Sequence, residues 1–170
     1  NSGFKAISWV NKIKDDERNQ FESKKRQDYQ WQQFSITQLN NQSELIKSNT
    51  RPCYFAVEYI EPLNENKTAL GYDIFSNEVR KTAITNAINK NELQITSRIK
   101  LVQDTSGYSF LAIMPVMKSS ISTNNLNSIE NVKGLISSVF KVDKLIENAL
   151  FRTKNFDIGL AIYDISSSRK

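Results

Sequence analysis

Short segments of alternating or continuous apolar residues recur along the chain and restrict the folds open to it. Alternation with a period of two is typical of a strand with one buried face. The sequence predicts strands over residues 34–37, 54–60, 95–101, 108–117, 134–140 and 156–165. The segment 108–117 is apolar almost throughout, which predicts that this strand lies centrally in a sheet.

Three other segments carry helix signals. Residues 15–30 predict a polar helix with one weak apolar face around Phe21. A second helix is expected to begin at Ser76, a suitable N-cap, and then to place apolar residues at helical spacing: Val79, Ala83, Ala87 and Ile88. A third is expected after residue 140, with a buried stripe of Val142, Leu145, Ile146 and Leu150. The order of elements predicts an α+β fold, a PAS-like antiparallel sheet flanked by helices.

The residue types that are missing exclude several classes of enzyme. The chain has no histidine and one cysteine, Cys53, so it can form neither a Ser-His-acid triad, nor a His-bearing zinc site, nor an internal disulfide. Its five glycines are too far apart for a P-loop or a dinucleotide fingerprint. Catalysis by paired carboxylates or by lysine stays formally open. We expect a domain that is not an enzyme and has no cofactor and no metal.

The basic residues do not form a nucleic-acid surface. The formal net charge is +5, which permits contact with an anionic partner. However, lysines and arginines are spread along the chain, and the densest run, 24–26, is followed by Asp28. Because no stripe of basic and aromatic residues is present, we expect no nucleic-acid partner. No apolar stretch reaches membrane-spanning length.

An ordered series of short motifs spans nearly the whole chain. It begins with residues 7–10, Glu17-Arg18 and Phe21-Glu22, and continues with Tyr54-Phe55, residues 59–62 and residues 69–73. It ends with Ser76, Arg80, Ala83, Thr96, Ile99, residues 101–103, Pro115-Val116, Gly134, Val139-Phe140 and Tyr163-Asp164. In this series the chain resembles the CHASE domains, the extracytoplasmic sensor modules of plant cytokinin receptors and of bacterial histidine kinases and GGDEF- or EAL-type enzymes.

The resemblance implies an architecture and a location. It implies a PAS-like fold with an N-terminal helix leading in from the membrane, and three parts of one CHASE domain: residues 1–33 near the stalk, a ligand-sensing lobe at 34–140, and a membrane-proximal helix and strand at 141–170. The parent protein would be a transmembrane receptor on the periplasmic or extracellular face of a bacterial cell membrane. It would act as a homodimer that binds a small-molecule ligand. The alternative is a dimerisation module that binds no small ligand.

The same resemblance names candidate ligand-binding residues: Tyr72, Asp73, Arg80, Thr96, Val102, Gln103 and Ile113. Each has a structural alternative. Asp73 stands before a helix and could cap it, Thr96 could bond a neighbouring backbone group, and Tyr72 could be a core residue. The backbone of Val102-Gln103 could contact a ligand without any special side chain. Ile113 stands where plant receptors carry a small hydroxyl residue, which would make the pocket wall more apolar.

Arg80 gives the sharpest hypothesis about the ligand. In the register of the family motif it stands where plant receptors carry an acid that accepts a hydrogen bond from adenine. A guanidinium has only donors. The substitution therefore predicts weak binding of adenine cytokinins and a ligand with an acceptor or an anionic group, such as a carboxylate. The alternative is that Arg80 turns outward and pairs with Asp73 or Glu78.

Overall fold

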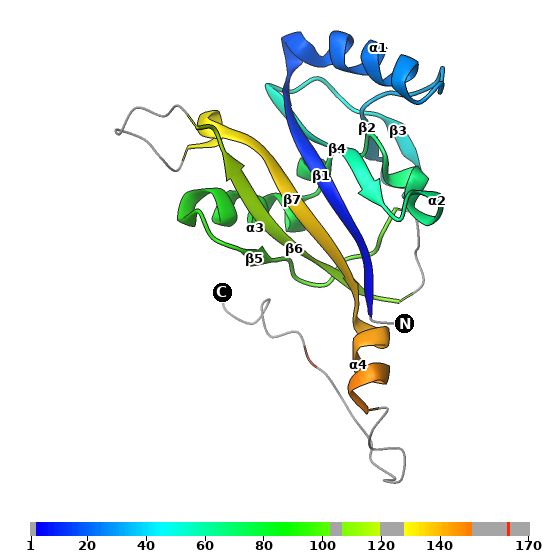
Figure 1. The fold of residues 1–170 in the computed structure, drawn as a ribbon, viewed down its shortest axis with the longest axis vertical. Helices are drawn as coiled ribbons and strands as arrows, with labels where there is room; N and C mark the ends of the chain where they lie inside the picture. Colours follow the sequence, from blue (N-terminus) through cyan, green and yellow to red (C-terminus); the bar gives the residue numbers. More distant parts are fainter. Residues whose placement is uncertain (1–2, 103–106, 120–127, 151–162, 164–170) are drawn as a thin grey trace.

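The computed structural model describes residues 3–102, 107–119, 128–150 and 163, and its largest unit is a twisted antiparallel sheet (Figure 1). Within these residues the sheet has five strands in the order β4-β1-β7-β6-β5. The strands are β1 (Phe4–Lys14), β4 (Cys53–Glu61), β5 (Gln94–Ile95), β6 (Ser109–Met117) and β7 (Val132–Lys141). The expected α+β architecture, an antiparallel sheet flanked by helices, is confirmed.

Strand β1 is an inner strand of the sheet, between β4 and β7, although its sequence did not predict a strand. The expectation of an N-terminal helix leading in from the membrane is not shown, because β1 comes first and α1 follows it. Ala6, Ser8 and Val10 alternate on the buried face of β1. Since β1 pairs with both β4 and β7, the sheet crosses the proposed boundary at residue 33. The division into 1–33, 34–140 and 141–170 stays a prediction.

Two of the expected strands differ in length or place. The strand expected at 95–101 is only β5 (Gln94–Ile95), with an isolated bridge from Ile99 to Ser109. The Thr96 hydroxyl accepts the hydrogen bond of the Leu111 N–H, so a side chain replaces a ladder acceptor there. Of the strand expected at 34–37, only Thr37 lies in a strand, β2 (Thr37–Leu39). Strand β2 pairs with β3 (Leu45–Lys47). Segment 108–117 corresponds to β6, which pairs on both sides as expected for an inner strand.

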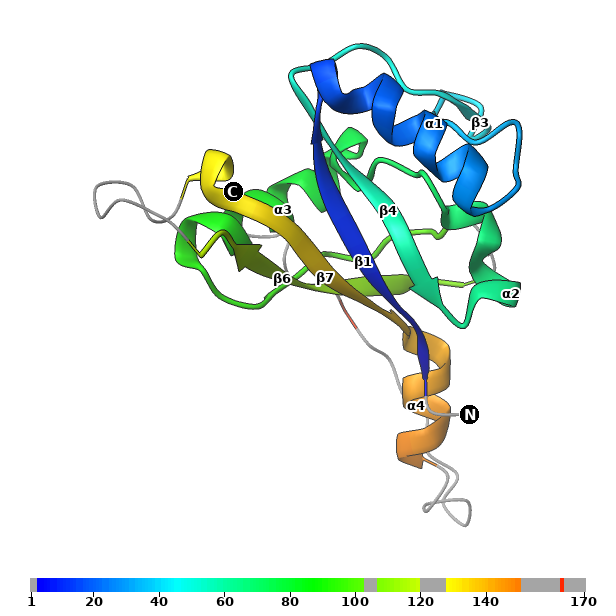
Figure 2. The same ribbon diagram turned by 45° about the horizontal axis from the view of Figure 1, so that its top comes forward.

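The helices flank this sheet. Helix α3 (Glu78–Lys90) lies behind β6 and β7 in Figure 1, and its buried residues Ile84, Ala87 and Ile88 join the main core. Helix α1 (Arg18–Asp28) follows the short turn η1 (Asp15–Glu17), as expected, and lies beside the end of β1 and β4 in Figure 2. The remaining elements are short: α2 (Leu63–Asn66), η2 (Lys67–Ala69), η3 (Ile74–Ser76) and η4 (Ile129–Asn131).

The N-cap of α3 is Asn77 and not Ser76. The Asn77 side chain accepts a hydrogen bond from the Arg80 N–H. Ser76 instead ends η3, where its hydroxyl donates to the Asp73 carbonyl at 2.6 Å. Two adjacent capping residue types competed for one position, and the preceding turn used the first of them.

Helix α4 (Val142–Leu150) does not bury the stripe expected of it. Val142, Leu145 and Ile146 are half-buried, and Leu150 is exposed. The strand expected at 156–165 falls outside the described residues, apart from Tyr163, which is exposed. Among the described residues, no helix has the length and apolarity needed to cross a membrane.

Candidate functional site

A small cavity of about 30 Å³ lies between the sheet and the start of α3. Its walls come from β1, β4, β6, β7 and α3 and include Ser8, Val57, Arg80, Leu111, Ser137 and Val139. Ser8, Leu111, Ser137 and Val139 lie at buried positions of their strands. Alternate residues of a strand point to the same face of a sheet, so these four side chains lie on its buried face. The cavity is therefore lined mainly by residues of the core.

Arg80 is the one charged side chain among the described residues that line this cavity. It is only 4% exposed. Its Nη1 donates to the Tyr72 hydroxyl at 3.0 Å, and its Nη2 donates to the Lys100 carbonyl at 2.9 Å. The guanidinium also lies 5.2 Å from the centre of the Tyr72 ring, a cation–π contact. The guanidinium is thus held by two neutral groups, the Tyr72 hydroxyl and the Lys100 carbonyl.

No carboxylate among the described residues pairs with Arg80. The two acids considered as outward partners are engaged elsewhere: Asp73 pairs with Arg51, and Glu78 lies in solvent beside Lys81. Burial lowers the pKa of Arg80, and the neighbouring Tyr72 offsets this only in part. An arginine nevertheless remains protonated. The cavity wall therefore carries a buried positive charge without a balancing negative one in the described part of the chain.

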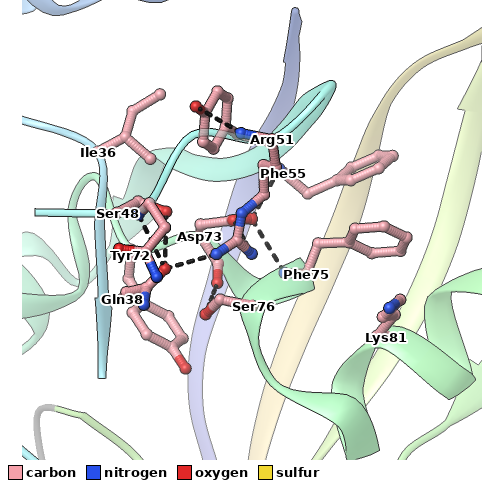
Figure 3. Close-up of polar contacts among 12 residues, drawn as sticks. Ile36, Gln38, Ser48, Arg51, Phe55, Tyr72, Asp73, Phe75, Ser76 and Lys81 are labelled. Atoms are coloured by element: carbon pink, nitrogen blue, oxygen red, sulfur yellow. Dashed lines mark hydrogen bonds and ion pairs between the residues drawn. The ribbon is translucent and has the colours of Figure 1, made fainter. Parts of the chain in front are cut away.

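Asp73 performs the capping role that the sequence left open. Its Oδ1 accepts from the Phe55 N–H at 2.9 Å and from the Phe75 N–H at 3.1 Å, and Asp73 is the N-cap of η3. Its Oδ2 lies 3.0 Å from Nη1 of Arg51 (Figure 3). Burial raises the pKa of this carboxyl to about 6, against the lowering effects of its two backbone donors and Arg51. Asp73 does not line the cavity, and its role as a ligand contact stays a prediction.

Arg51 connects Asp73 to the small β2–β3 sheet. Its Nη2 donates to the Gln38 side chain, which also accepts from the Ser48 hydroxyl and the Asn49 N–H. In Figure 3 the chain of contacts runs from Asp73 through Arg51 to Gln38. This cluster joins β2, β4 and the entry to α3, so it fixes the backbone on which Tyr72 stands.

The other candidate residues are divided between three places. Tyr72 and Val102 line the Arg80 cavity. Thr96 accepts from the Leu111 N–H, the structural role considered for it, and lines a different and larger cavity of about 730 Å³ with Tyr108 and Phe110. Ile113 is fully buried in the core on β6 and does not line the Arg80 cavity. Gln103 lies outside the described residues.

Two serines of the cavity wall were missed. Ser8 on β1 donates to the Ser137 carbonyl on β7 at 3.2 Å, and both residues are buried. The signal was available in part, because Ser8 stands between Ala6 and Val10 in a period-two pattern. Small polar residues at buried positions of two strands indicate a polar spot inside a core. Among the described residues, no group of three His, Cys, Asp or Glu side chains could hold a metal ion.

Comparison with known proteins identifies the family. A profile of the CHASE domain family matches residues 1–170, so the chain belongs to the CHASE domain family. The chain is also 22% identical over 157 residues to a protein described as "Adenylate cyclase, germination specific" from Dictyostelium discoideum. The match covers 91% of this chain and 18% of that relative, so the chain spans about a fifth of the relative's length. The chain is a sensor domain of a signalling receptor, of the extracellular type found in membrane receptors.

Proposed function

We propose that this CHASE domain binds a small-molecule ligand in the cavity beside Arg80 and transmits that binding across a membrane. The receptor would lie in a bacterial cell membrane with this domain on its outer face. Its cytoplasmic output would be a histidine kinase or a cyclase or phosphodiesterase of the GGDEF or EAL type. The similarity to a protein described as an adenylate cyclase supports an enzymatic output outside this domain.

The observation that carries this proposal is the buried guanidinium of Arg80. Removing a charge from water costs several kcal/mol unless a partner compensates for it. Arg80 has two neutral acceptors and no described carboxylate. A ligand that offers an acceptor or a negative charge would supply the missing partner. The amino group of adenine would instead present a donor to a donor, which disfavours adenine cytokinins.

The position of the cavity gives a route for the signal. Ser8 on β1 and Ser137 on β7 both line it. At one end of the sheet, β1 begins beside the junction of β7 and α4, where the Lys141 N–H donates to the Gly3 carbonyl at 2.9 Å (Figure 1). Gly3 also has no room for a side chain, since a Cβ would lie 2.8 Å from Leu145 of α4. A ligand that binds one arrangement of β1 and β7 better would shift the equilibrium between two positions of this end.

Calorimetric titration of the 170-residue domain tests the proposal. Adenine cytokinins and small carboxylates are titrated into wild type, Arg80→Ala and the control Lys81→Ala, which changes an exposed cation on the same helix. We expect carboxylate binding in wild type and Lys81→Ala and no binding in Arg80→Ala. Micromolar cytokinin binding that survives Arg80→Ala would contradict the proposal.

One observation favours dimerisation as a second function. Ile7, Met114 and Ile136 are exposed on neighbouring strands of the sheet. The pairing Trp9–Ile136–Met114 makes part of this surface continuous across β1, β7 and β6. Exposed apolar surfaces of this kind mark interaction sites. We propose that the receptor is a homodimer with much of its contact elsewhere, so sedimentation should find this domain monomeric or weakly dimeric at micromolar concentration. A tight dimer that Ile136→Asp dissociates would assign the main contact to this sheet.

A further inference from the structure

The size of the Arg80 cavity limits what can bind there. Its volume is about 30 Å³, and a cavity needs at least about 10–15 Å³ to hold one water molecule, so there is room for only a few non-hydrogen atoms. Its apolar walls include Val57 on β4, Leu111 on β6 and Val139 on β7, which all belong to the main core. Core side chains are closely packed against their neighbours, so enlarging the cavity would displace them and destabilise the fold.

The guanidinium is also held in one orientation. Tyr72 and Lys100 accept from its two Nη atoms, and the Tyr72 ring covers it at 5.2 Å. Among the described residues these are the only hydrogen bonds of the guanidinium, which has five N–H donors. A planar fork with donors left over suits a planar anion with two oxygens, because two parallel N–H···O bonds can form at once.

We propose that the ligand of this cavity is a very small planar oxyanion, a carboxylate of one or two carbons, recognised by the Arg80 guanidinium and selected by size. This inference rests on the proposed function and narrows it. The anion would neutralise a buried charge that nothing else in the described chain neutralises. Its alkyl part would face Val57, Leu111 and Val139, so a longer chain would have to displace core side chains.

Expected affinities follow from the size of such ligands. A ligand of four non-hydrogen atoms has a ceiling on its affinity that corresponds to a Kd of about 0.05 mM. We therefore expect acetate to bind with a Kd of about 0.1–1 mM, and formate, which has three such atoms, to bind no tighter than a Kd of about 0.5 mM. Each further methylene should weaken binding by about tenfold, because overpacking a core is costly.

The test is a nuclear magnetic resonance titration of the folded 170-residue domain with formate, acetate, propionate, butyrate and hexanoate at constant ionic strength. In wild type we expect the tightest binding for formate or acetate. Leu111→Ala enlarges the cavity and should move the optimum to propionate or butyrate. Leu135→Ala, a buried residue of β7 that does not line the cavity, is the matched control and should leave the optimum unchanged. If Leu111→Ala does not fold, Val139→Ala provides a smaller enlargement.

The outcomes separate this inference from the proposed function. Affinity that rises with chain length through hexanoate in wild type would overturn the size limit, yet loss of that binding in Arg80→Ala would keep Arg80 as the ligand site. Acetate binding that survives Arg80→Ala would overturn the inference directly. If none of these acids binds while a larger ligand does so through Arg80, the inference is wrong and the function stands. If no ligand binds through Arg80 at all, both are wrong.

Discussion

Two regions of this domain bury positive charges, and only one of them gives each buried cation a carboxylate partner among the described residues. On α1, Arg18 is 7% exposed and Lys25 is 1% exposed. Each has a carboxylate partner, Glu22 at 2.8 Å from Arg18 and Glu58 at 2.7 Å from Lys25. On α3, Arg80 is 4% exposed, and its guanidinium donates hydrogen bonds only to a hydroxyl and a carbonyl among the described residues.

The pKa directions express the same contrast. Burial lowers the pKa of Lys25, but hydrogen bonds to Glu58 and Tyr59 outweigh it, so the pKa is raised on balance. At Arg80 burial also lowers the pKa, and no carboxylate offsets it. A protein that neutralises its structural cations so thoroughly on α1 has the residues to do so on α3. The proposed ligand at Arg80 would account for this difference, since the buried cations of α1 already have carboxylate partners.

The largest expected effect on stability comes from removing the carboxylate of Glu22, which pairs with Arg18 on α1. Glu22 accepts from Arg18, from the Ile36 N–H at 3.0 Å and from Arg26 at 3.1 Å. Replacing it by glutamine keeps the shape but leaves the buried Arg18 and the partly exposed Arg26 without their counter-charge. We expect Glu22→Gln to lower the free energy of unfolding by about 3–5 kcal/mol, measured by urea denaturation. A loss below about 1 kcal/mol would show that Glu22 is not essential to this cluster.

The next effect concerns the buried acid Asp73, whose folded pKa is raised to about 6 above an ordinary value of 3.8. The folded state binds the proton more tightly than the unfolded state, so this group stabilises the fold below pH 3.8 and that contribution is lost as the pH rises through about 6. A shift of about two pH units corresponds to about 3 kcal/mol.

Urea denaturation of wild type and Asp73→Asn between pH 4 and 7 measures this contribution. Over this pH range the difference between the two proteins should change by about 2 kcal/mol in favour of the variant as the pH rises. A difference that stays constant with pH would mean that Asp73 has the same pKa in both states, and the Arg51 pair would then compensate fully for burial.

A smaller effect is expected on α3, where removing the cation should cost little. Arg80→Met fills similar space without a charge, so the free energy of unfolding should stay within about 1 kcal/mol of wild type or rise. Arg18→Met, its counterpart on α1, should destabilise the domain clearly because it leaves Glu22 buried and unpaired. Equal losses in the two variants would remove the distinction between the two regions.

The smallest effect is expected for Glu78 on α3, and it tests whether this acid interacts with Arg80. Glu78 is the acid nearest to Arg80 in sequence on that helix, but it is exposed beside Lys81 at 3.5 Å. We expect Glu78→Gln to change the free energy of unfolding by less than about 0.5 kcal/mol. Carboxylate affinity measured by calorimetry should stay the same. A marked gain in affinity would reveal that Glu78 competes with the ligand for Arg80.

Local patterns in the sequence predicted much of the fold, and the family resemblance named Tyr72 and Arg80 of the cavity wall. Alternation located β4, continuous apolarity located β6, and helical spacing located α3, because each pattern reflects burial along a single element. The same reasoning missed β1, whose segment contains three lysines and a serine, although both of its edges are paired. It also placed the N-cap of α3 one residue early, since Ser76 and Asn77 are equally suitable until the preceding turn is known.

The sequence by itself determined which chemistry the site can use: a guanidinium at position 80, with neither histidine nor a cysteine pair in the chain, whatever its fold. Only the tertiary structure decided that this guanidinium is buried without a described acid, and that Ser8 and Ser137, 129 residues apart, meet beside the same cavity. The physical reason is range. Residue type and spacing act within one helix or strand, whereas the desolvation of a charge depends on every segment that packs around it.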